Sequence, residues 1–229
     1  MDYRKEYEKW LASPALSEDE RAELRALEGN DKEIKARFYG PLEFGTAGLR
    51  GTMYTGLHNM NRHVIRWATQ GFANVIRAEG TEAMQKGVAV CMDCRNHSAE
   101  FARETACVMA ANGIHVRLFE SLRPTPELSF AVREYGCQAG VNVTASHNPK
   151  EYNGYKVYWA DGAQLPPQHA AAIADELTRI DIFTGVQSMD YEQALAEGRI
   201  ELLGEDCDRR FMANVMGMVN DYELSLIHI

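Results

Sequence analysis

The sequence lacks any long hydrophobic run. Its 229 residues include no apolar stretch close to the roughly 20 residues that a membrane-spanning helix requires. The first ten residues, 1–10, are charged throughout and do not have the pattern of a secretory signal. We therefore expect no membrane partner and a cytoplasmic location.

An excess of positive charge is also missing. The chain has 24 Lys and Arg residues against 33 Asp and Glu residues, which gives a net charge of −9. No basic stripe offsets this balance, and nucleic acid is therefore excluded as the main partner. An acidic protein can still bind a small phosphorylated ligand where its few cations converge.

Cysteines are few and odd in number. The five cysteines have irregular spacing, which favours reduced thiols in a cytoplasmic protein over a disulfide framework: they are Cys91, Cys94, Cys107, Cys137 and Cys207. Cys91 and Cys94 form a single Cys-x-x-Cys pair, and no second pair is spaced to complete a zinc site. A redox motif remains an alternative, but Cys91 ends the apolar run 88–91, which favours a core cysteine.

The sequence contains no Gly-x-Ser-x-Gly nucleophile elbow, which disfavours a serine hydrolase. It does contain Thr-Ala-Ser-His-Asn-Pro at 144–149, between the strand-like runs 139–143 and 155–159. Asn153-Gly154 is predicted to be a turn before the second run. Ser146 is thus expected on a loop between two buried strands. His147 points the opposite way on an extended segment, and an ordinary polar surface turn remains open.

Helices are predicted to precede the sheet. Tyr3, Tyr7 and Trp10 recur at helical spacing and indicate a packing face. Ser17 begins a capping-box pattern that ends at Glu20, and a third short helix is expected over 32–39. We interpret residues 1–40 as a helical extension.

Helices and strands then alternate. We expect helices over 61–79, 98–112, 124–135 and 167–180, with strands at 88–92 and 114–119. This alternation predicts an α/β domain over 41–186, with a mixed, largely parallel sheet flanked by helices. Ser146 would then follow the carboxyl end of a strand, where such sheets place ligands. The strand 199–202 and the helix 205–219 are expected to start a second, similar domain over 187–229.

A glycine-rich segment, Leu-Glu-Phe-Gly-Thr-Ala-Gly-Leu-Arg-Gly at 42–51, precedes this alternation. Its three glycines bracket Thr46 and Arg50 and allow the backbone to approach a ligand closely. A flexible connector is the alternative. The guanidinium of Arg50 has the planar fork that suits phosphate oxygens.

Three of these segments together resemble the α-D-phosphohexomutase superfamily, and in particular its phosphoglucomutase/phosphopentomutase-type phosphosugar mutases. The window 144–156 is similar to the family's phosphoserine loop, 45–51 to its N-terminal arginine motif, and Asp93-Cys94-Arg95 to its Asp-x-Arg turn. The resemblance implies the fold of phosphohexomutase domain I.

The resemblance also implies site residues. Ser146 would carry the phosphoryl group, with Lys156 as the loop lysine, Arg50 reaching the phosphoserine, and His147 as a catalytic neighbour. Thr46 and Asn148 would contribute to phosphate binding, while Asp93 and Arg95 would brace the loop. From the residues alone, the alternative for Lys156 is a surface lysine in an edge strand. Asp93 and Arg95 are equally a structural ion pair, and His147 is equally a proton shuttle or a residue that holds the loop.

The activity implied is interconversion of sugar 1-phosphates and 6-phosphates through a bisphosphorylated sugar, with a sugar phosphate as the small-molecule partner. Glucose 1-phosphate is the favoured substrate and glucose 1,6-bisphosphate the primer. Mg²⁺ is the expected cofactor, held in part by the phosphoryl group on Ser146. Family members are longer, and the downstream magnesium, sugar and phosphate loops do not occur here. We therefore expect a truncated, inactive chain; a non-catalytic phosphosugar-binding fragment is the alternative, and the oligomeric state is not indicated.

Overall fold

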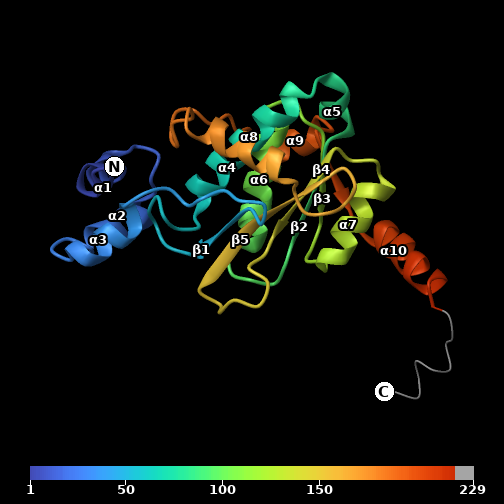
Figure 1. Ribbon diagram of the computed structural model, residues 1–229, viewed down its shortest axis with the longest axis horizontal. Helices are drawn as coiled ribbons and strands as arrows, with labels where there is room; N and C mark the ends of the chain where they lie inside the picture. Colours follow the sequence, from blue (N-terminus) through green and yellow to red (C-terminus); the bar gives the residue numbers. More distant parts are fainter. Residues whose placement is uncertain (220–229) are drawn as a thin grey trace, which may run out of the picture.

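The computed structural model describes residues 1–219, in which a six-stranded sheet lies between two layers of helices (Figure 1). Residues 220–229, which end the predicted second domain, lie outside the described part. The strands are β1 (Leu49–Thr52), β2 (Val88–Met92), β3 (Val116–Phe119), β4 (Ala139–Val143), β5 (Tyr152–Trp159) and β6 (Ile200–Leu203). Among residues 1–219, no helix has the length and apolar character to cross a bilayer.

The sheet is mixed and largely parallel, as the sequence predicts. Its strand order is β1-β5-β4-β2-β3-β6. Strands β4, β2, β3 and β6 run parallel to one another, while β5 is antiparallel to both β4 and β1. All residues of β2 and β4 are buried, as expected for central strands covered on both faces.

Helices cover both faces of the sheet. Helices α4 and α6 lie on one face, with α8 packed on α4 and α9 on α6, while α7 covers the other face with α10 packed on it (Figure 1). The helices are α1 (Tyr3–Ala12), α2 (Glu18–Arg25), α3 (Asp31–Phe38), α4 (Arg62–Ala78), α5 (Thr81–Lys86), α6 (Ser98–Ala111), α7 (Thr125–Glu134), α8 (Pro167–Leu177), α9 (Tyr191–Ala196) and α10 (Glu205–Gly217).

The predicted helix starts are mostly confirmed by their caps. The Asn61 side chain accepts hydrogen bonds from the amides of His63 and Val64 and begins α4. The capping box that begins at Ser17 is present in full at α2. Helix α6 differs, because its N-cap is His97 in the left-handed region at φ 62°, without a side-chain cap.

The N-terminal helices pack onto the main core. Trp10 is fully buried, and its ring contacts Phe38 and His63 edge to face at centroid distances of 5.7 Å. The predicted packing face is therefore confirmed. A polar contact reinforces it, since Nε2 of His63 on α4 lies 3.1 Å from Oε1 of Glu20 on α2.

Neutralising Glu20 is expected to loosen this attachment. Burial alone would raise the pKa of Glu20, but hydrogen bonds with His63 and with the Ser17 amide outweigh burial and lower the pKa from 4.5 to about 2. The folded-state pKa is thus below the unfolded-state value, so the carboxylate stabilises the fold above pH 4.5 and loses this effect as pH falls toward 2. Glu20→Gln should cost about 2 kcal/mol at pH 7.

Urea unfolding at several pH values measures this effect. The difference between wild type and Glu20→Gln should shrink as the pH falls toward 2. Asp19→Asn, at an exposed position on the same helix, is the matched control and should cost clearly less. If the difference in unfolding free energy between wild type and Glu20→Gln did not change with pH, the stabilising role of the Glu20 carboxylate would be contradicted.

One prediction about domain organisation is wrong. The strand expected to begin a second domain, β6, pairs in parallel with β3 and extends the same sheet. Residues 200–203 therefore belong to this sheet, beyond the boundary predicted at 186/187. The local apolar pattern identified a strand, but only long-range pairing decides which sheet it joins. That the chain from 204 onward enters a further domain stays a prediction.

The predicted turn at Asn153-Gly154 is also wrong, because both residues lie within β5. Asn153 is fully buried, and its Nδ2 donates to the Asn96 carbonyl and to Ser98 Oγ. A Cβ at Gly154 would approach the carbonyl oxygen of Thr144 to 2.6 Å. The glycine here permits close strand packing rather than a turn. The sequence also gave no indication of β1, α5 or α9.

Candidate active site

The loop between β4 and β5 presents Ser146 to solvent. Ser146 is exposed and has φ 58°, one of two non-glycine residues with positive φ among residues 1–219. Its amide donates to Thr144 Oγ1 at 3.0 Å, which holds the tight turn. A serine held in this left-handed conformation costs free energy, which is often a feature of functional loops.

Arg95 holds the carbonyl groups of this loop. Its Nη2 donates to the Ser146 and Asn148 carbonyls, both at 2.8 Å. Its Nη1 donates to the Pro149 and Tyr152 carbonyls at 2.9 and 3.0 Å. One guanidinium therefore fixes four backbone positions of the loop from its inner side.

Asp93 holds Arg95 in turn. Its Oδ2 lies 3.2 Å from Nε of Arg95, and its Oδ1 accepts hydrogen bonds from the Arg95 amide and from Ser98 Oγ. The two alternatives predicted for Asp93 and Arg95, a structural ion pair and support of the loop, are therefore both present: the ion pair orients the guanidinium that holds the loop. Ser98 and Asn153, which sequence reasoning did not assign to the site, connect this pair to β5. The capping pattern at Ser98 gave only a local signal for it.

Replacing Arg95 by lysine is expected to release the loop. Lysine keeps the charge but cannot reproduce a planar fork that bonds four carbonyls. The Arg95 side chain is only 12% exposed, and hydrogen bonds to a charged group are strong. We expect a loss of about 2 kcal/mol in the free energy of unfolding.

Thermal unfolding and hydrogen exchange of the loop amides measure this release. Faster exchange should be confined to residues 146–152. The matched control is Arg179→Lys, because Arg179 is exposed and pairs only with two carboxylates on α8. The control should change stability by less than about 0.5 kcal/mol. Equal effects of both substitutions would contradict the role of Arg95.

Arg50 reaches the same loop from β1. The register pairs Arg50 with Gly154, and Arg50 Nη1 donates to Asn148 Oδ1 at 3.0 Å. Lys156 lies two residues beyond Gly154 on β5, so its side chain points to the same face as that of Arg50. The fold therefore brings Arg50 into contact with Asn148, two residues from Ser146, and sets Lys156 on the same face of the sheet as Arg50.

The charge of Lys156 is affected by this environment. Burial lowers the pKa of Lys156, Arg50 lowers it further, and Asp93 opposes them. Strand β5 lies between β1 and β4, so Lys156 is not the edge-strand lysine that the alternative interpretation assumed. A new anion on the loop would relieve the repulsion between these two cations.

Two predicted residues are not brought into contact with Ser146. His147 is exposed and has no hydrogen bond within the described part of the chain. Thr46 is exposed at the tip of a turn in which Gly45 and Gly48 exchange backbone hydrogen bonds of 3.2 and 2.8 Å. Their proposed roles need a ligand that reaches them.

A cavity of about 400 Å³ adjoins the serine. Its wall includes Ser146, Asn148, Lys150, Arg95 and Cys94.

Four of the five cysteines are buried and Cys94 is exposed; all five are free thiols. The core interpretation thus holds for Cys91 and fails for Cys94.

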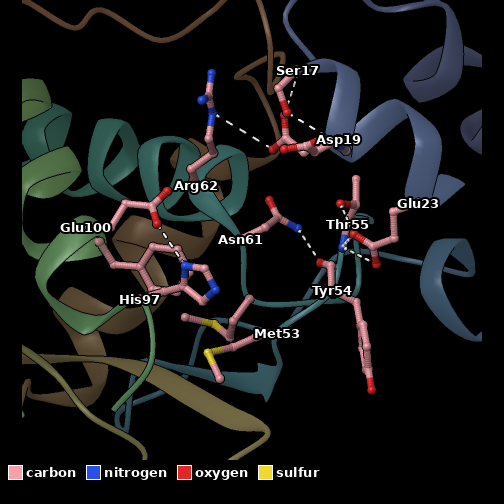
Figure 2. A pocket seen from close by; sticks show the side chains of 13 residues that line it. Ser17, Asp19, Glu23, Met53, Tyr54, Thr55, Asn61, Arg62, His97 and Glu100 are labelled. Atoms are coloured by element: carbon pink, nitrogen blue, oxygen red, sulfur yellow. Dashed lines mark hydrogen bonds and ion pairs between the residues drawn. The ribbon is translucent and has the colours of Figure 1, made fainter. Parts of the chain in front are cut away.

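A second cavity, of about 320 Å³, lies between α2, the start of α4 and the start of α6. Figure 2 shows Glu100 contacting His97 on one side and Glu23 contacting Thr55 on the other. None of the sequence-predicted site residues lines it. A smaller, third cavity lies beside both: His97 lines it and the second cavity, and Lys150 lines it and the cavity next to Ser146.

The described residues do not supply a magnesium site. Among residues 1–219, no three carboxylate, imidazole or thiol groups converge to hold a metal ion. Asp93, which supports the loop, is occupied by Arg95 and Ser98. The arrangement of a serine and two cations is one that suits phosphoryl chemistry.

Comparisons with known proteins agree with this geometry. Residues 41–182 match the family model for the α/β/α domain I of phosphoglucomutase/phosphomannomutase. A phosphopentomutase from Homo sapiens is 41% identical over 156 residues, covering 66% of this chain and 26% of that protein. A phosphoglucomutase from Staphylococcus saprophyticus is 33% identical, covering 84% of this chain and 34% of that protein. The chain thus spans about a quarter to a third of these relatives.

A solved structure shows the same fold. It is a phosphoglucomutase/phosphomannomutase family protein from Burkholderia thailandensis, which superposes with a TM-score of 0.58 at 21% identity. The superposition covers 77% of this chain and 36% of that one.

Proposed function

Because the chain belongs to the phosphoglucomutase/phosphomannomutase family, we propose that Ser146 is the phosphoryl carrier of a phosphosugar mutase. The observation that supports this proposal is that Ser146 is exposed on a loop held by Arg95, that Arg50 contacts Asn148 of the same loop, and that the charge of Arg50 reaches Lys156. Phosphoryl transfer depends on positioning and charge neutralisation, which this arrangement can supply.

The proposed transfer starts from phosphorylated Ser146. A sugar hydroxyl attacks the phosphorus in line, and its bond to phosphorus forms as the bond to Oγ of Ser146 breaks. Lys156 returns a proton to the departing Oγ, and the proton of the sugar hydroxyl leaves to a base, for which His147 is the candidate. The product is a bisphosphorylated sugar, whose other phosphate then returns to Ser146 by the reverse step.

The two cations are proposed to hold the phosphoryl group. Phosphoserine carries nearly two negative charges near neutral pH. The fork of Arg50 can bind two of its oxygens, and Lys156 provides a point charge.

We propose glucose 1-phosphate as the substrate and glucose 1,6-bisphosphate as the primer. The relative from Staphylococcus saprophyticus, named a phosphoglucomutase, supports a hexose. The relative from Homo sapiens, named a phosphopentomutase, supports a pentose phosphate as the alternative. We expect the 229-residue chain to accept phosphate from the primer, and negligible turnover of sugar phosphates by these residues stays a prediction.

Intact-mass spectrometry after exposure to glucose 1,6-bisphosphate tests the proposal. A gain of one phosphoryl group supports transfer. A second candidate, a non-catalytic phosphosugar-binding protein, is favoured only by the cavity of about 400 Å³ beside Ser146. It predicts saturable binding in calorimetry with no covalent gain in mass.

A further inference from the structure

Asn142 is a buried amide with one unused acceptor. It is 1% exposed and lies on the face of β4 that packs against α7. Its Nδ2 donates to Thr125 Oγ1 at 2.7 Å, at the start of α7. Its Oδ1 is buried and has no hydrogen-bond partner within residues 1–219. A buried acceptor left in this state destabilises a fold, and a donor beside it is therefore expected to serve it.

Two side chains flank Asn142 on this face. Its register partner on β2 is Cys91, and its partner on β5 is Lys156. The Cys91 thiol already donates to the Arg123 carbonyl. The Lys156 ammonium makes no hydrogen bond or ion pair with any described residue. Directly opposite residues of an antiparallel pair lie side by side on one face. Lys156 and Asn142 are therefore neighbouring residues, and a change in the Lys156 side-chain rotamer would bring its ammonium to Asn142 Oδ1, which has no partner here.

We propose that Asn142 is a positioning residue for Lys156, whose ammonium donates a hydrogen bond to Asn142 Oδ1. This inference rests on the proposed function, in which Lys156 serves the phosphoryl group on Ser146. The contact holds the ammonium on the α7 face of the sheet, two residues along β5 from the position that pairs with Arg50. The lysine is then available when Ser146 receives its phosphate.

Thr125 and Lys156 together determine how the Asn142 amide is oriented. A threonine hydroxyl can donate or accept, whereas a lysine ammonium only donates. With Nδ2 directed at Thr125, the carbonyl end of Asn142 is left for Lys156. The three residues form a chain from the first turn of α7 to the cation of the site.

The contact should also keep Lys156 charged. Burial and Arg50 both favour the neutral amine, and Asp93 favours the ammonium. An oxygen acceptor adds to the effect of Asp93. The elements that form this face also carry other titratable or charged groups: Cys91 on β2, Tyr158 on β5, Glu127, Arg133 and Glu134 on α7, and Arg123 before α7.

The test is an NMR titration of the Lys156 Nζ signal in the 229-residue chain. Asn142→Leu keeps the shape and removes the acceptor, and should lower the pKa of Lys156 by about one unit. Asn142→Asp should raise it by at least about one unit. The same Lys156 titration in wild type and Asn142→Leu would overturn the proposal.

A second variant protects the test against misfolding. Thr125→Val removes the partner that orients the amide and should lower the pKa of Lys156 by a smaller amount. If Asn142→Leu does not fold, an unchanged titration in Thr125→Val overturns the proposal. Tyr158→Phe, two residues from Lys156 on the same strand face, is the matched control and should leave the titration unchanged.

The outcome is separable from the proposed function. The titration needs no catalysis, so a chain that never takes up phosphate contradicts the mutase proposal without changing the Lys156 result. Where phosphate is taken up, the pH dependence of its rate should move to lower pH in Asn142→Leu. A uniform loss of rate with an unshifted pH profile would indicate a merely structural residue and would contradict the inference.

Discussion

Replacing Ser146 by alanine should abolish the covalent uptake of phosphate from glucose 1,6-bisphosphate. The hydroxyl is the atom that forms the bond to phosphorus in our proposal, and no other group of the loop can substitute for it at the same position. Thr144 is 5% exposed and its hydroxyl accepts a hydrogen bond from the Ser146 amide, which keeps it turned inward. Intact-mass spectra should show complete loss of the phosphorylated species.

The fold should survive this substitution. The Ser146 side chain is exposed, and the loop is held through backbone carbonyl groups, which alanine retains. Alanine at φ 58° is somewhat less favourable than serine, at a cost below about 1 kcal/mol. Ser188→Ala, at an exposed position remote from the loop, is the matched control and should take up phosphate normally. Equal uptake by wild type and Ser146→Ala would refute the proposed role.

Gly48→Ala should be the most destabilising single substitution in the glycine-rich segment. Gly48 has φ +75°, and a Cβ there would lie 1.8 Å from the carbonyl oxygen of Tyr155. This carbonyl belongs to the backbone of a strand paired on both sides, so it cannot move aside cheaply. We expect a loss of about 4 kcal/mol or more, at the exceptional end of single substitutions.

Gly45→Ala provides the matched control. Gly45 exchanges hydrogen bonds with Gly48 in the same turn, but a Cβ at Gly45 meets no atom within 4 Å. Its substitution should change stability by no more than about 0.5 kcal/mol. Urea unfolding of both variants makes the comparison. Similar, small effects would show that the turn is a flexible connector, which the sequence alone left open.

Local signals predicted the elements with strong periodicity. The cap at Asn61 and the apolar spacing of α4 lie within one segment, and so do the runs that became β2 and β4. Strand β1 could not be found this way. Its four residues form a strand because they pair with β5, about a hundred positions later in the chain, and the glycines nearby indicated a loop.

Asn153 shows the opposite error. The dipeptide Asn-Gly is a strong hairpin signal, but here the pairing of β5 with both β1 and β4 overrides it. Tertiary contacts use the small glycine for close packing and the asparagine as a buried link to Ser98. A local pattern cannot distinguish these uses.

The candidate site was predicted chiefly through family resemblance. Composition and spacing placed Ser146 on a loop after a strand, yet they left its role open. The convergence of Arg50 on Asn148, from positions 98 residues apart, depends on the sheet register. Asn142 was missed because it lies within an apolar run, where a single polar residue gives no periodic signal.

The most direct test is to locate the phosphate by fragment-ion mass spectrometry after incubation with glucose 1,6-bisphosphate. Our account predicts a single modified peptide that contains residues 144–150, with the phosphoryl group on Ser146. Phosphate on a different residue, or an unmodified peptide after saturating exposure of a folded chain, would contradict it.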